Sequence, residues 1–114
     1  MRQMFSGCKN LENIDISSFE AKNVIDMNSM FYLCTNIINI DLSSFDTKKV
    51  KDMKYMFSNC WSVLSLNLSS FDINFLSAFD MLYDCFHLEK VIIKKESSGI
   101  ISVQSNHIFE IIKV

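Results

Sequence analysis

Four cysteines are the residues whose chemistry and spacing stand out: Cys8, Cys34, Cys60 and Cys85 recur at intervals of 26, 26 and 25 residues. Thiols can form disulfides, ligate metals or act as nucleophiles. Zinc sites typically use close Cys-x-x-Cys pairs, and this chain has none. His87 lies two residues from Cys85, and residues two apart do not face each other on a helical turn. The spacing favours buried, reduced cysteines that pack as small apolar side chains, with an occasional disulfide between repeats or a metal as alternatives.

Most of the sequence recurs with the cysteines. A methionine lies four positions before each cysteine, and apolar residues lie three, six and eight positions after it. The first three units share a Ser-Ser-Phe triplet at residues 17–19, 43–45 and 69–71, and its phenylalanines are expected to stack in the core. Repeats of roughly 20–50 residues indicate stacked units that bury their apolar faces against one another. We therefore expect about four stacked coils.

The pattern changes along each unit. Positions six and eight after the cysteine are apolar with an outward position between them, which predicts short half-buried strands at residues 13–16, 39–42, 65–68 and 90–93. These strands should pair in parallel, about 4.8 Å apart. Apolar residues three and four apart around each cysteine predict one or two inward-facing helical turns. Residues 24–27 and 50–53 predict a second, shorter ladder.

The C-terminal stretch breaks the period. β-rich runs separated by turn-forming residues predict a C-terminal β cap over residues 94–114, after a repeat region over residues 1–93. The chain has no proline and only two glycines, so its turns must depend on Ser, Asn and Asp. Ten phenylalanines and seven methionines beside one tryptophan suggest a core filled by large side chains.

Residues 30–53 carry, nearly position by position, the motif Met-Phe-x-x-Cys-x-x-Leu-x-x-Leu-Asp-Leu-Ser-x-Phe-Asp-Thr-x-x-Val-x-x-Met. This motif resembles the leucine-rich repeat of BspA-like surface proteins, and the resemblance covers roughly residues 1–93. The fourth unit departs from this motif, because residues 93–96 read Ile-Lys-Lys-Glu. The resemblance implies an α/β leucine-rich-repeat solenoid on the surface of a bacterium, mycoplasma or parasitic protist. Members of that family are associated with adhesion to host proteins, cells or extracellular matrix.

The outward strand residues form the candidate ligand face. They are Asn13, Asp15, Asn39, Asp41, Ser65, Asn67 and Lys90. Within this face, the row of Asp15, Asp41 and Asn67 could attract a cation. Its alternative is a row that is solvated or bonded to neighbouring serines, because facing carboxylates repel each other.

Composition and motifs exclude several function classes. The net charge is −2 with acids and bases mixed, so there is no basic stripe for nucleic acid or anionic lipid. No run of 18 apolar residues predicts a membrane span. Residues 1–8 lack the apolar region of a signal peptide. Without a Gly-rich phosphate loop, an acid–base pair or a nucleophile motif, neither enzyme activity nor a cofactor is expected.

The sequence thus predicts a non-enzymatic cell-surface or secreted repeat module that binds a protein or a glycan, as part of a longer array. The alternatives are a structural spacer and a degenerate gene fragment with no ligand. The missing leader leaves a cytoplasmic location as another alternative. Because the first unit begins in mid-repeat, self-association through an uncapped N-terminal coil is also expected.

Overall fold

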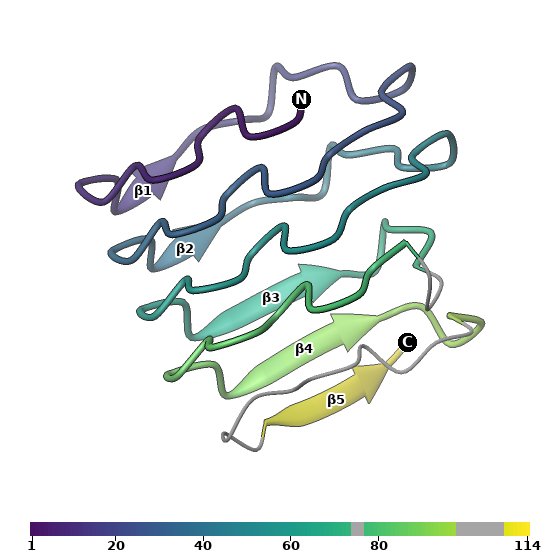
Figure 1. Ribbon diagram of the computed structural model, residues 1–114. Helices are drawn as coiled ribbons and strands as arrows, with labels where there is room; N and C mark the ends of the chain where they lie inside the picture. The colour runs from purple at the N-terminus through teal and green to yellow at the C-terminus, as the bar shows by residue number, and fades with distance from the viewer. Residues whose placement is uncertain (74–76, 98–108) are drawn as a thin grey trace.

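The chain forms short parallel strands, as a computed structural model that describes residues 1–73, 77–97 and 109–114 shows. The strands are β1 (Asn13–Ile14), β2 (Asn39–Ile40), β3 (Ser65–Leu68), β4 (Lys90–Ile93) and β5 (Glu110–Lys113). β1 pairs with β2, and β4 lies between β3 and β5 in a second sheet. In Figure 1 the strands lie side by side in chain order, and the chain returns along the opposite side before β2, β3 and β4.

The strand register follows the repeat. Asn13 pairs with Asn39, an offset of 26 residues, and Ser65 pairs with Lys90, an offset of 25. These offsets equal the intervals between the cysteines, so equivalent positions of consecutive units lie next to each other. The prediction of parallel strands at these positions is confirmed.

The first two strands are shorter than predicted. β1 and β2 end at Ile14 and Ile40, two residues early, whereas β3 and β4 have the predicted bounds. A longer pairing would place Asp15 directly beside Asp41, and facing like charges destabilise a strand pair. In the second sheet the same position pairs a neutral Asn67 with Ile92. Repulsion at this position disfavours a longer first ladder but does not forbid one, since Asp26 pairs with Asp52 elsewhere in the same units.

The second ladder is reduced to one contact. Within residues 24–27 and 50–53, a single parallel bridge joins Asp26 to Asp52. Both carboxylates accept a hydrogen bond from the backbone N–H two residues later, at Asn28 and Lys54, at 2.9 and 3.0 Å. These side chains turn the backbone here, which stops the pairing after one residue.

The predicted helical turns are wrong, because the described residues contain no helix. Tight turns replace them. The N–H of Met30 donates to the carbonyl of Met27 within its unit, whereas the N–H of Phe31 donates to Met56 in the next unit. This alternation continues along residues 29–34, while a helix would direct every N–H to a carbonyl four residues earlier. Hydrogen bonds between units thus take the place of helical ones.

Two residues of each unit have left-handed backbone: the residue five positions before the cysteine and the residue directly before it. The residues are Gln3 and Gly7, Ser29 and Leu33, Tyr55 and Asn59, and Asp80 and Asp84. A left-handed conformation costs a residue other than glycine about 1–2 kcal/mol. The stacking of neighbouring units therefore outweighs a local preference that is unfavourable at seven of these eight positions.

We expect Tyr55→Gly to stabilise the protein by up to about 1 kcal/mol, since relief of the left-handed strain exceeds the entropic cost of glycine. Tyr55 has a φ of 57° and is 38% exposed, so the loss of its remaining ring contacts offsets part of this gain. Tyr83 is the matched control, because it is 36% exposed and its φ is not positive. Tyr83→Gly should destabilise by about 0.5–1 kcal/mol. Equal losses in urea denaturation of both variants would contradict the backbone assignment.

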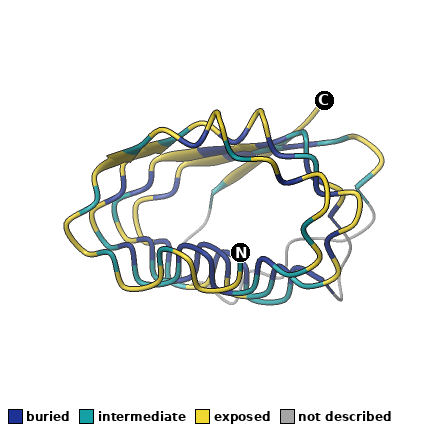
Figure 2. Ribbon diagram, turned by 90° about the horizontal axis from the view of Figure 1, so that it is seen from above, coloured by how far each residue is buried: buried dark blue, intermediate teal, exposed yellow. Residues whose placement is uncertain are grey.

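The core lies between the strands and the turn segments, where the buried residues line the inside of the stack (Figure 2). Phe31 stacks between Phe5 and Phe57, with ring centroids 5.4 and 5.3 Å apart. Phe45 and Phe71 stack at 6.3 Å, as predicted. Phe19 was expected to stack with Phe45 and Phe71. Instead it is half-buried and stacks on Phe5 at 6.0 Å.

Only part of the predicted cap falls within the described residues, which omit residues 98–108. In the described part, β5 pairs in parallel with β4 and places Glu110 beside Lys90. The last strand therefore continues the same ladder, with a new strand on the existing edge.

Candidate functional site

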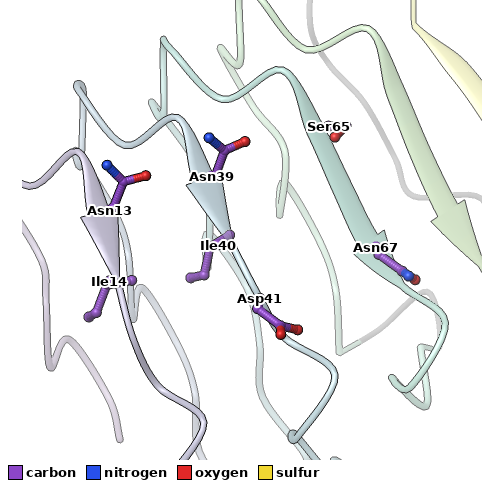
Figure 3. A pocket seen from close by; sticks show the side chains of 7 residues that line it. All are labelled: Asn13, Ile14, Asn39, Ile40, Asp41, Ser65 and Asn67. Carbon is purple, nitrogen blue, oxygen red and sulfur yellow. The ribbon is translucent and has the colours of Figure 1, made fainter.

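The predicted ligand face is exposed along its whole length. Its first column contains the first residue of each of the strands β1–β4: Asn13, Asn39, Ser65 and Lys90. The second column lies two residues further along and contains Asp15, Asp41 and Asn67. Figure 3 shows Asn13 and Asn39 side by side, with Asp41 just beyond the end of β2 and Asn67 further along β3.

A shallow hollow of about 420 Å³ lies over the first three units of this face. Its lining contains Asn13, Ile14, Asn39, Ile40, Asp41, Ser65 and Asn67. Five of the seven predicted residues are therefore brought together, while Asp15 and Lys90 are not part of the lining. Ile14 and Ile40 were missed because their spacing predicts inward-facing core positions, yet both are only half-buried.

The first column is not used to hold the fold together. The side chains of Asn13, Asn39 and Ser65 have no hydrogen-bond partner within the described part of the chain. Each of the strands β1, β2 and β3 thus presents an exposed amide or hydroxyl group at the same position. These donors and acceptors are free to bind a ligand.

The second column has a structural role. Asp15 Oδ1 accepts hydrogen bonds from the backbone N–H and the hydroxyl of Ser17, at 3.0 and 2.7 Å. These bonds lower the pKa of Asp15, and the hydrogen bonds from Ser43 lower the pKa of Asp41 in the same way. Asn67 is neutral and makes the equivalent contacts. The row is serine-bonded and caps the turn after each strand.

The described ranges contain neither a metal-binding cluster nor a spanning helix. No group of three or more His, Cys, Asp or Glu residues there could hold a metal ion. Within the same ranges, no helix has the length and hydropathy needed to cross a membrane.

The cysteines form an internal hydrogen-bonded row. Cys34, Cys60 and Cys85 are buried, Cys8 is half-buried, and all four are free thiols. Each buried thiol donates to a phenylalanine carbonyl of the preceding unit, as Cys60 does to Phe31 at 3.1 Å. The cysteines therefore join adjacent units, in agreement with the predicted buried, reduced state.

Burial makes these thiols poor nucleophiles. Removal from water raises the pKa of Cys34 to about 11 and that of Cys85 to about 12. The same cause raises the pKa of Cys60. Because the thiolate is the reactive form, these cysteines are protonated and unreactive at neutral pH.

We expect the free energy of unfolding to fall as the pH rises above about 8.5, where unfolded thiols begin to ionise. The folded-state pKa values are raised, so this stability is complete below that pH and is lost as the pH rises through about 11 and 12. The slope should be at most about 1.4 kcal/mol per pH unit for each thiol. Urea denaturation between about pH 8 and pH 10 measures it. A Cys34→Ala/Cys85→Ala variant should show a shallower slope, and an unchanged slope would contradict the assignment.

Two exposed aromatic residues lie near the start of the face and were missed by the sequence analysis, which assigned large side chains to the core. Trp61 and Phe86 directly follow Cys60 and Cys85, and are 43% and 45% exposed. Their ring centroids are 6.3 Å apart, with the planes tilted by 43°. Trp61 and Phe86 are defined here as the aromatic pair.

The backbone beside the aromatic pair is held in place. His87 Nδ1 lies 2.6 Å from the carbonyl oxygen of Trp61, and the Ser62 hydroxyl donates to Thr35 at 2.8 Å. In the first two units, the position of the pair is occupied by Lys9 and Thr35. At this repeat position the residues are polar in the first two units and aromatic in the next two. This change was the sequence signal that could have identified the aromatic pair.

A family model described as "Mycoplasma protein of unknown function, DUF285" matches residues 1–108. No curated protein and no solved structure matches the chain.

Proposed function

The chain belongs to the family described as Mycoplasma protein of unknown function, DUF285, and from this premise we propose that it is a non-enzymatic module of a cell-surface or secreted protein that binds a protein or glycan. We propose further that its stacked units form a leucine-rich-repeat solenoid, like the repeats of the BspA-like surface proteins that its motif resembles. Stacked repeats present extended surfaces that suit binding.

The first column is the observation that supports this proposal. Asn13, Asn39 and Ser65 are exposed, recur at one position of each unit and have no partner within the described residues. The fold is stabilised elsewhere, by the buried thiols, the phenylalanine stack and the capping side chains of the second column. The residues that stabilise the fold are thus separate from those available to a ligand.

Cell binding tests the proposal. The fluorescently labelled chain should bind cultured host cells or matrix-coated surfaces, and the triple variant Asn13→Ala/Asn39→Ala/Ser65→Ala should bind at least tenfold more weakly. Its melting temperature should be unchanged, since the three side chains make no internal contacts that stabilise the fold.

The matched control is Glu20→Ala/Lys22→Ala/Lys51→Ala, three exposed residues outside the ligand face. This variant should bind like the unmodified chain. Absence of binding by the unmodified chain would favour the structural spacer. Equal binding by both triple variants would exclude the first column as the ligand site.

A further inference from the structure

The spacing and chemistry of the ligand face point to one class of ligand. We propose that the face binds a neutral, linear glycan that runs across the strands, with one sugar unit for each repeat unit. This inference rests on the proposed binding function and specifies its ligand.

The period of the face supports this orientation. Asn13 pairs with Asn39 in the first sheet and Ser65 with Lys90 in the second, both in parallel register, so the residues of each pair are about 4.8 Å apart. An extended peptide advances only about 3.2–3.4 Å per residue and would lose register within two or three units. A hexose in an extended polysaccharide advances by a length close to the strand spacing, so each sugar meets an equivalent group.

The side chains suit sugar hydroxyls. Asn13 and Asn39 offer both amide donors and carbonyl acceptors, Ser65 offers a hydroxyl, and Asp41 has a second carboxylate oxygen that the serine contacts leave free. Hydrogen bonds from neutral hydroxyls to a carboxylate are among the stronger ones. Protein interfaces depend on aromatic or Arg anchors near the centre of the contact, whereas these two columns are polar throughout the first three units and the aromatic pair lies outside them.

Charge excludes acidic glycans from this part of the face. Asp15 and Asp41 are ionised at neutral pH, as carboxyl groups normally are, and the serine hydrogen bonds lower their pKa values further. The only cation of the two columns is Lys90, at the far end. A sulfated or sialylated chain would meet like charges in the first two units, whereas a neutral chain would not.

The aromatic pair supplies a second feature with the same period. Trp61 and Phe86 occupy equivalent positions in consecutive units, four residues before Ser65 and Lys90 of the first column. The C–H faces of sugars pack on exposed aromatic rings, and both rings are partly exposed, at 43% and 45%. Polar columns beside aromatic rings match the two surfaces of a sugar, its hydroxyls and its C–H face.

Titration calorimetry of the full chain tests the proposal. The probes are neutral linear oligosaccharides of two to six glucose, N-acetylglucosamine or galactose-type units, and a heparin hexasaccharide as the anionic probe. For at least one neutral series, affinity should rise with each added unit and level off at four or five, and heparin should bind at least tenfold more weakly. Asn13→Ala/Asn39→Ala and Trp61→Ala should each weaken binding at least fivefold, whereas Glu20→Ala should not.

The outcomes separate this inference from the proposed function. If no neutral oligosaccharide binds but cell binding still depends on the first column, the inference of a neutral linear glycan is overturned and the binding function stands. Binding that does not depend on length, or a preference for heparin, also overturns the inference. If neither cells nor oligosaccharides bind, the proposed function itself fails.

Discussion

Cys60→Asp should unfold the protein at neutral pH. Cys60 is fully buried and its thiol donates to the Phe31 carbonyl of the preceding unit. A carboxylate cannot donate when ionised, so two acceptors would face each other in an apolar interior. Burial of an unpaired charge costs several kcal/mol, which is comparable to a total stability of about 5–15 kcal/mol. Circular dichroism and size-exclusion chromatography would show the loss of structure.

Two smaller changes at Cys60 separate charge from shape. Cys60→Ser keeps a donor for the Phe31 carbonyl, and Cys60→Ala removes it while leaving that carbonyl its hydrogen bond from the Cys34 N–H. Both variants should remain folded, with losses of about 1–2 kcal/mol. A folded Cys60→Asp protein with stability near that of Cys60→Ala would show that this position is open to water.

Phe31→Ala should destabilise the protein by about 3–5 kcal/mol, the usual cost of removing a buried aromatic ring. Phe31 is fully buried and lies between two parallel rings, so its loss leaves a cavity in the column that joins the first three units. The cavity cannot close easily, because the hydrogen bonds of residues 29–34 fix the spacing between neighbouring turns. Thermal and urea denaturation measure the change.

Phe86→Ala is the matched control, because Phe86 is 45% exposed. It should change the stability by less than about 1 kcal/mol. Equal losses in Phe31→Ala and Phe86→Ala would mean that the stacked column does not stabilise the core.

Repetition made much of the architecture predictable. One unit alone predicts little, but equivalent apolar positions in four units indicate which residues must share an environment. The strands β3 and β4 and the burial of Cys34, Cys60 and Cys85 follow from that comparison. The parallel register follows too, because the offset between strands equals the offset between cysteines.

The errors have physical causes in hydrogen bonding between units. The spacing around each cysteine resembles a helix because tight turns also place residues three and four apart on one side. The left-handed residues Leu33 and Tyr55 give no local signal of these turns, since neither residue type favours that conformation. Backbone partners in the next unit determine the turns, and those partners are visible only in three dimensions.

The position of the ligand face could be predicted from the sequence. Which of its side chains make structural hydrogen bonds, and which have no partner within the described ranges, could not. Alternation along the strands indicates that Asn13 and Asp15 both face outward, and both are exposed. Only the structure shows that Asp15 bonds to Ser17 while Asn13 has no partner within the described ranges. The exposure of Trp61 was not predicted, because a single tryptophan in an apolar chain is typical of a core.

Disulfide trapping tests most directly the central claim, that equivalent positions of consecutive units lie side by side. In a Cys8→Ala background, Asn13→Cys with Asn39→Cys places two thiols on paired residues whose Cα atoms are about 4.8 Å apart, within the range that disulfides permit. Asn13→Cys with Ser65→Cys places them two units apart, at roughly twice that distance. Mass spectrometry after mild oxidation should find the 13–39 disulfide in nearly all molecules and no 13–65 disulfide. Failure of the 13–39 pair to form, or efficient formation of the 13–65 pair, would contradict the stacking of the units.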